Sequence, residues 1–173
     1  LATLPIAAGS VTTSGISAGG YMAVQFHVAH SSLVSGVGVV AAGPYYCAEN
    51  SLRHALGRCM KGDEPIAVDE LAGLTSEFAL AGRIDPIANL ANDRVWIFHG
   101  GADPVVAKPV VDALQAYYEL FVDPLGVQRN ELAGAGHTFP AAAAGLQDCG
   151  KTATPFVGSC GVDGARQMLE HLY

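Results

Sequence analysis

The chain has 173 residues, of which 50% are hydrophobic and 14% are charged, and its formal net charge is −7. This length supports one domain with a sizeable core, and the apolar composition excludes intrinsic disorder. The acidic balance argues against nucleic acid or anionic membranes as partners, and no apolar run reaches the roughly 18 residues that span a bilayer. The first residues, Leu1–Pro5, carry no basic or long apolar signal segment, so we interpret them as a mature N-terminus.

The stretch 10–20 contains the pattern on which the functional interpretation depends. A β-prone run at 11–13 leads into Gly15-Ile16-Ser17-Ala18-Gly19, which matches G-x-S-x-G, and an apolar stretch compatible with a helix follows from Tyr21 to His30. Strand, sharp turn and helix are the context in which this motif exposes a nucleophilic serine. The pattern therefore predicts Ser17 as the nucleophile, with Gly15 and Gly19 providing room for the strained turn.

The remaining elements alternate between strands and helices, which predicts an α/β fold with a mostly parallel sheet. We expect Met22, Phe26 and Ala29 to face the sheet, and His27 and His30 to be surface or satisfied core residues. Residues 44–63 and 149–160 are expected to be irregular. The expected strands are 34–42, 94–98 and 127–132, and the expected helices are 64–81, one from about Pro109, and 165–173.

Two further motifs supply partners for Ser17. Asp103 follows the apolar run 95–98 in His-Gly-Gly-Ala-Asp, and His137 follows the run 127–132 in Gly-Ala-Gly-His. The order Ser, Asp, His is that of the α/β-hydrolase arrangement, in which acid and base each lie on a loop after a strand. The alternatives are a helix N-cap for Asp103 and a solvated loop position for His137. Asp148 and His99 are the reserve candidates. Asp85 is set aside because it follows a helix rather than a strand, and Asp93 because it lies before its strand.

The four cysteines fall into two local pairs, Cys47 with Cys59 and Cys149 with Cys160. Four cysteines allow three connectivities, and proximity favours the local one; four free thiols in a cytosolic protein are the alternative. Disulfides indicate an oxidising compartment, so we expect a secreted, extracellular or periplasmic, protein. The spacing fits no metal site, and we expect no metal and no cofactor.

The remaining site residues follow from position. The backbone N–H of Ala18, directly after the nucleophile, is the expected oxyanion donor. The segment 44–63 follows a strand at the same sheet edge as Ser17, so Tyr45 and Tyr46 are candidate substrate-binding residues; ordinary packing is the alternative. The second oxyanion donor normally comes from a loop before the nucleophile strand, and only about ten residues precede that strand here.

The motifs together resemble those of polyhydroxybutyrate depolymerases with an N-terminal lipase box. The resemblance rests on the residues 12–25, Gly43-Pro44-Tyr45-Tyr46-Cys47-Ala48, His99-Gly100-Gly101-Ala102-Asp103-Pro104-Val105-Val106, Gly134-Ala135-Gly136-His137-Thr138-Phe139-Pro140 and Cys160-Gly161-Val162-Asp163-Gly164-Ala165. It implies a circularly permuted α/β-hydrolase that is secreted and hydrolyses poly(3-hydroxybutyrate) with Ser17, Asp103 and His137. It also implies that related chains continue beyond the position of Tyr173 into a segment that completes the sheet.

Three functional hypotheses follow. The first is a secreted serine esterase that cleaves a polyester through an acyl-enzyme, and the second is a carboxylesterase for small or aromatic, feruloyl-type esters. The third is a catalytically incomplete hydrolase scaffold that serves as a binding module. We expect residues 1–173 to form one α/β-hydrolase catalytic domain of about four parallel strands, lacking a C-terminal segment. Because the Ser17 strand would then have one neighbour only, a second polypeptide segment is the expected partner.

Overall fold

The computed structural model describes residues 10–173, and its core is a parallel sheet in the order β1-β2-β3-β4. The prediction for Leu1–Pro5 lies outside these residues. The four expected parallel strands are confirmed, and the strand that leads to Ser17 is at one edge of the sheet. The strands are β1 (Val11–Ile16), β2 (Val34–Val40), β3 (Arg94–Gly100) and β4 (Val127–Leu132).

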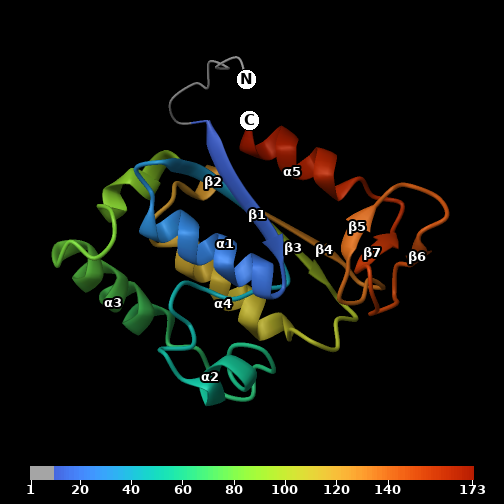
Figure 1. The fold of residues 1–173 in the computed structure, drawn as a ribbon, viewed down its shortest axis with the longest axis horizontal. Helices are drawn as coiled ribbons and strands as arrows, with labels where there is room; N and C mark the ends of the chain where they lie inside the picture. Colours follow the sequence, from blue (N-terminus) through green and yellow to red (C-terminus); the bar gives the residue numbers. More distant parts are fainter. Residues whose placement is uncertain (1–9) are drawn as a thin grey trace, which may run out of the picture.

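Helices cover both faces of this sheet, as parallel strands require. Figure 1 shows α1, α3 and α4 on one side of the sheet and α5 on the other. Within the described residues no helix is long and apolar enough to cross a membrane. The helices are α1 (Ala18–Ala29), α2 (Leu52–Leu56), α3 (Val68–Leu80), α4 (Lys108–Glu119) and α5 (Gly164–Leu172), with the short 3₁₀ helices η1 (Ile87–Asn92) and η2 (Pro124–Gly126).

Two glycines on one face of β2 allow α5 to pack closely against the strand. A Cβ added to Gly38 would collide with the side chain of Met168 on α5, and one added to Gly36 would stand 3.2 Å from Leu172. These two glycines therefore let α5 approach the strand, while Val37 and Val39 are fully buried in the core cluster. Alternation along a strand places the two sets on opposite faces of the sheet.

The predicted sheet-facing side of α1 is wrong. Met22 is 66% exposed and Phe26 is 42% exposed. The helix begins at Ala18, directly after Ser17, and the tight turn sets its rotation. Small residues then face the strands: a Cβ on Gly20 would lie 3.0 Å from the Cβ of Ala42. The buried positions are Gly20, Ala23, Val24, His27 and Val28.

The prediction of an irregular segment at 149–160 holds except for the short strand at 157–159. The chain after β4 forms a second, small parallel sheet in the order β5-β7-β6, and Cys149 directly follows β6 while Cys160 directly follows β7. Strands of two or three residues leave no readable alternation, so sequence periodicity could not reveal them. The strands are β5 (Phe139–Ala141), β6 (Gln147–Asp148) and β7 (Val157–Ser159).

Candidate active site

Ser17 occupies a sharp turn between β1 and α1. Its φ is 56° and its ψ is −126°, a conformation that L-residues rarely adopt. Its N–H donates to the Val40 carbonyl (2.9 Å), which continues the ladder with β2, and its own carbonyl accepts from the Tyr21 N–H (2.9 Å), which starts the helix. The serine therefore belongs to strand and helix at once, as in the strained turn that carries the nucleophile of α/β-hydrolases.

The two glycines of the motif have different roles. A Cβ on Gly15 would overlap the backbone of Gly19 and lie 2.7 Å from the Gly20 nitrogen, whereas one on Gly19 would have no described atom within 4 Å. Only the prediction for Gly15 is therefore confirmed: this residue must lack a side chain, because the backbone at Gly19 passes directly beside it.

We predict opposite effects for alanine at these two positions. Gly15→Ala should destabilise the fold by about 1–3 kcal/mol through overpacking and should displace Ser17. Gly19→Ala, the matched control inside α1, should be neutral or stabilise by up to about 1 kcal/mol because alanine favours helix. Urea unfolding of both variants measures the difference. Equal stability of the two variants would mean that the turn tolerates a side chain at residue 15 and would contradict this prediction.

Asp103 and His137 form a hydrogen-bonded pair at the ends of β3 and β4. His137 Nδ1 lies 2.7 Å from Asp103 Oδ2, and the two side chains are 5% and 1% exposed. The other carboxylate oxygen, Oδ1, accepts from the backbone N–H groups of Val105 (2.7 Å) and Val106 (3.0 Å). Burial alone would raise the pKa of Asp103, but the hydrogen bonds from His137, Val106 and Val105 outweigh it and hold the pKa below its usual value.

The loop that carries His137 is held by the small sheet region. The Gly136 N–H donates to the Cys149 carbonyl (2.9 Å), and the His137 N–H donates to Thr152 Oγ1 (2.9 Å). The imidazole also meets the ring of Phe156 edge-on, with 6.1 Å between centroids. Sequence reasoning missed Thr152 and Phe156, because no local pattern links them to a histidine 15 or more residues earlier.

Neither the reserve candidate Asp148 nor Asp93 takes part in this pair. Asp148 is exposed on β6 and accepts from the Gly150 N–H (2.8 Å). Asp93, at the opposite end of β3, binds His27 Nε2 (3.0 Å), and His27 Nδ1 lies 3.0 Å from the Tyr118 hydroxyl. His27 is fully buried, so its prediction as a satisfied core residue is confirmed.

A cavity of about 420 Å³ adjoins the serine turn, between α1 and the segment after β2. Ala18 lies at its edge, and as the first residue of α1 it has an N–H without an acceptor inside the helix. Tyr46 lines the cavity, whereas Tyr45 is only 7% exposed and belongs to the hydrophobic core. The burial of Tyr45 favours the alternative of ordinary packing for this residue. The cavity is lined by Ala18, Tyr21, Met22, Gln25, Tyr46, Cys47, Ala48, Glu49, Asn50, Ala55 and Cys59.

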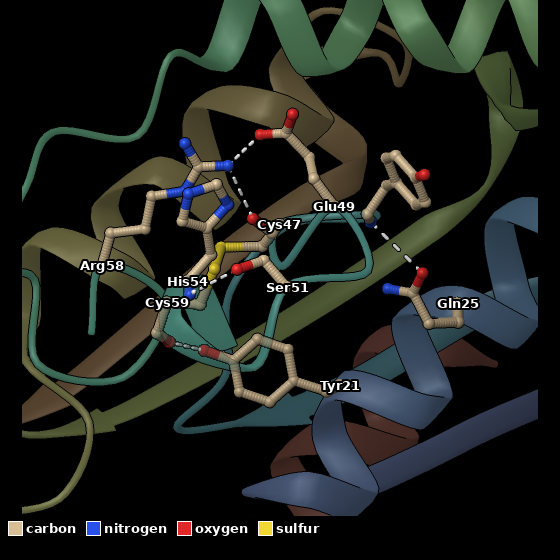
Figure 2. Close-up of a disulfide and its surroundings, with 9 residues drawn as sticks. Tyr21, Gln25, Cys47, Glu49, Ser51, His54, Arg58 and Cys59 are labelled. Atoms are coloured by element: carbon tan, nitrogen blue, oxygen red, sulfur yellow. Dashed lines mark hydrogen bonds and ion pairs between the residues drawn. A yellow bond between two sulfur atoms is a disulfide. The ribbon is translucent and has the colours of Figure 1, made fainter. Parts of the chain in front are cut away.

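Two of the residues that line this cavity, Cys47 and Cys59, form a disulfide, and Figure 2 shows it with the side chains around it. Cys47 and Cys59 are bonded, and so are Cys149 and Cys160, which confirms both predicted pairs. The Tyr21 hydroxyl donates to the Cys59 carbonyl, and the Gln25 side chain accepts from the Tyr46 N–H (3.2 Å). Two side chains of α1 thus tie the wall to the helix that begins at Ser17. Burial raises the pKa of Tyr21, so its hydroxyl stays a protonated donor.

The described residues offer no cluster of three or more His, Cys, Asp or Glu side chains that could hold a metal ion. The chemistry available here is that of a serine, a histidine and a carboxylate at the carboxyl ends of the parallel strands. Ser17, Asp103 and His137 all follow the carboxyl ends of parallel strands, where such sites lie in open α/β sheets.

The fold and the placement of these residues define the class as an α/β-hydrolase. Comparison with known proteins then shows what the chain is similar to. The chain is 42% identical, over 174 aligned residues, to the poly(3-hydroxybutyrate) depolymerase of Delftia acidovorans, covering 100% of this chain and 35% of that protein. It is 34% identical to the polyhydroxybutyrate depolymerase of Talaromyces funiculosus, covering 95% of this chain and 48% of that protein. No family model matches the chain.

Solved structures agree with these sequences. The crystal structure of PHB depolymerase from Penicillium funiculosum matches with a TM-score of 0.85 and 31% identity, covering 96% of this chain and 52% of that one. A serine-to-alanine variant of a PHB depolymerase, complexed with an R3HB trimer, matches with the same TM-score at 30% identity. The resemblance drawn from the motifs is therefore confirmed. In sequence and in fold, the chain is similar to a part of these depolymerases, and it spans about one third to one half of the relatives it matches.

Proposed function

We propose that this chain carries the catalytic residues of a serine esterase that hydrolyses poly(3-hydroxybutyrate) or a related polyester. The observation that supports it most is the buried Asp103–His137 pair, which follows the carboxyl ends of β3 and β4 as Ser17, on its strained turn, follows the carboxyl end of β1. In this proposal residues 1–173 are one part of a single α/β-hydrolase catalytic domain.

The proposed reaction is acyl transfer to Ser17. His137 Nε2 takes the proton of the Ser17 hydroxyl while the oxygen attacks the ester carbonyl, and Asp103 at Nδ1 fixes the tautomer and stabilises the imidazolium. The Ala18 N–H donates to the oxyanion of the tetrahedral intermediate. His137 then protonates the departing alcohol, and a water molecule activated by the same histidine hydrolyses the acyl-enzyme.

The proposed substrate follows from the relatives and the cavity. Both curated relatives are named as depolymerases of hydroxybutyrate polymers. Apolar groups such as Met22 and Ala55 line the cavity beside Ala18 together with the polar side chains of Gln25, Glu49 and Asn50, and the apolar part suits an aliphatic ester unit. The two disulfides support the further proposal that the protein works outside the cytosol, in an extracellular or periplasmic setting.

Two assays on the protein as naturally produced test this substrate assignment. We expect clearing of a poly(3-hydroxybutyrate) film and also release of p-nitrophenol from a short-chain ester. Release without film clearing would favour a carboxylesterase for small or aromatic esters. Neither activity, together with no labelling of Ser17 by a fluorophosphonate, would favour the scaffold hypothesis.

We also propose that a further polypeptide segment pairs with β1. This strand is at the sheet edge, and among its residues Ser14 is exposed and the rest are only half-buried. Next to it, Met22 and Phe26 present apolar side chains on the outer face of α1. An open parallel edge beside an apolar helix face is a site that polypeptide normally covers. The relatives have two to three times the length of the matching region, which supplies such a segment.

Native mass spectrometry of the active species tests this second proposal. We expect either a longer chain or a second fragment that co-elutes with residues 1–173 and is lost with activity under denaturant. A monomer of the 173-residue chain alone, fully active, would contradict the proposal.

A further inference from the structure

His99 lies near the end of β3, buried directly beneath the turn that carries Asp103. Its side chain is among the fully buried ones, and its Nε2 lies 3.1 Å from the Val106 carbonyl oxygen. A carbonyl oxygen can only accept, so Nε2 carries the proton and donates it. Its Nδ1 is also buried and has no hydrogen-bond partner within residues 10–173. The one polar contact of the ring is therefore with Val106.

Val106 is itself a partner of the carboxylate. Its N–H donates to Asp103 Oδ1 at 3.0 Å, beside the N–H of Val105 at 2.7 Å. The remaining oxygen, Oδ2, receives His137 Nδ1 at 2.7 Å. A continuous chain of hydrogen bonds thus runs from the His99 ring through residue 106 to the carboxylate and then to His137.

The turn is also held from its far side. The Ala107 N–H donates to the Met60 carbonyl (2.9 Å), next to the disulfide-bonded Cys59. Val106 is 1% exposed, so water does not compete for its carbonyl oxygen. A buried carbonyl that loses its donor has to move or stay unpaired, and either result disturbs residues 103–107.

We propose that His99 is a positioning residue of the site, one that fixes the Asp103 turn through the Val106 carbonyl. It does not touch substrate, and the inference rests on the proposed function of Asp103 and His137. Loss of the His99 donor lets the turn shift, so the carboxylate meets the imidazole at a poorer angle. Misplacement of about 1 Å in such a constellation costs on the order of 100-fold in rate.

Four variants of the protein as naturally produced test this role, with a soluble p-nitrophenyl ester as substrate. His99→Phe fills the space without a donor and should lower kcat by about 10- to 100-fold with KM within about twofold of the parent. His99→Gln places an amide N–H near the position of Nε2 and should restore most of kcat, whereas the shorter His99→Asn should not. His171→Phe is the matched control, because His171 Nε2 donates to the Gly126 carbonyl (2.8 Å) from α5 in the same manner; its kcat should equal the parent's.

Two readouts separate positioning from simple loss of fold. In His99→Phe the acid limb of the kcat/KM profile should move to lower pH, because a poorly held carboxylate stabilises protonated His137 less. The downfield NMR proton of the Asp103–His137 hydrogen bond should be present in the parent and in His171→Phe, and shifted or lost in His99→Phe. If His99→Phe does not fold, the contrast between His99→Gln and His99→Asn decides.

The inference is overturned if folded His99→Phe keeps the parent's kcat, pH profile and downfield proton, or if the Gln and Asn variants behave alike. A parent protein that hydrolyses no ester would instead refute the proposed function. The NMR proton would still test the His99 contact in that case, because it reports the hydrogen bond without any turnover.

Discussion

Replacing Ser17 with alanine is expected to abolish ester hydrolysis, with kcat falling on the order of a million-fold if the Ser17 hydroxyl is the nucleophile. The methyl group cannot form the acyl-enzyme, and what activity remains comes from substrate binding and oxyanion stabilisation alone. The fold should survive, because alanine bears the same Cβ in the same positive-φ conformation (56°). The measurement is kcat on a p-nitrophenyl ester, with thermal unfolding as the check on folding.

Ser76→Ala is the matched control for this substitution. Ser76 lies on α3, and its hydroxyl donates to the Ala72 carbonyl (2.9 Å). Its loss should leave kcat unchanged and alter stability by roughly 0.5–1.5 kcal/mol at most. A Ser17→Ala variant that retained turnover comparable to this control would remove Ser17 from the mechanism.

Asp103→Asn should lower kcat by about 10⁴-fold while leaving the fold intact. An asparagine can still accept from Val105 and Val106 through its carbonyl oxygen, which leaves its NH₂ group facing His137 Nδ1. An NH₂ group only donates, so the imidazole must present Nδ1 as acceptor and carry its proton on Nε2. That tautomer cannot take a proton from Ser17.

Asp93→Asn provides an unusually close control for Asp103→Asn. The pair of Asp93 with His27 is also buried and has a similar geometry, with 3.0 Å between Oδ2 and Nε2, but it lies at the other end of the sheet. Asp93→Asn should therefore affect stability and leave kcat unchanged. A near-normal kcat in Asp103→Asn would mean that the acid lies elsewhere, and Asp148 would be the next carboxylate to replace.

The depressed pKa of Asp103 also predicts how stability depends on pH. The folded-state pKa of Asp103 is depressed, so the stability that its ionised form contributes is present above the unfolded pKa of about 3.9. That contribution disappears as the pH falls through the lower, folded-state pKa. The stability difference between the parent and Asp103→Asn should accordingly shrink as the pH is lowered from about 6 towards about 3.

Much of the site could be predicted because its residues belong to short local motifs. The turn around Ser17 needs Gly15, and the loops of Asp103 and His137 follow the neighbouring parallel strands β3 and β4, so the Asp103–His137 contact follows from strand order. The exposed side of α1 could not be predicted in this way. Met22 and Phe26 follow helical spacing, yet the rotation of that helix is set by the turn before it rather than by its apolar stripe.

The supporting residues were beyond sequence reasoning for a different reason. The motif marks His99 only as an alternative catalytic residue, and nothing in the neighbouring sequence indicates that its ring reaches the carbonyl of Val106. Thr152 contacts the backbone of His137 only after the chain has formed β5 and β6 and returned. Such contacts depend on how loops fold back in space, which neither residue spacing nor hydrophobic periodicity encodes.

The disulfide-bonded segment that walls the cavity lies outside the sheet whose strands carry the catalytic residues. Residues 48–58 lie between Cys47 and Cys59, and the loop is fastened to α1 by Tyr21 and Gln25, whereas Ser17, Asp103 and His137 follow strands of the sheet. Its lining side chains, such as Asn50 and Ala55, can therefore be exchanged without moving the serine turn. This division makes the segment a natural place for ester preference to diverge among descendants of one ancestor, and a compact target for laboratory libraries that seek new polyester substrates.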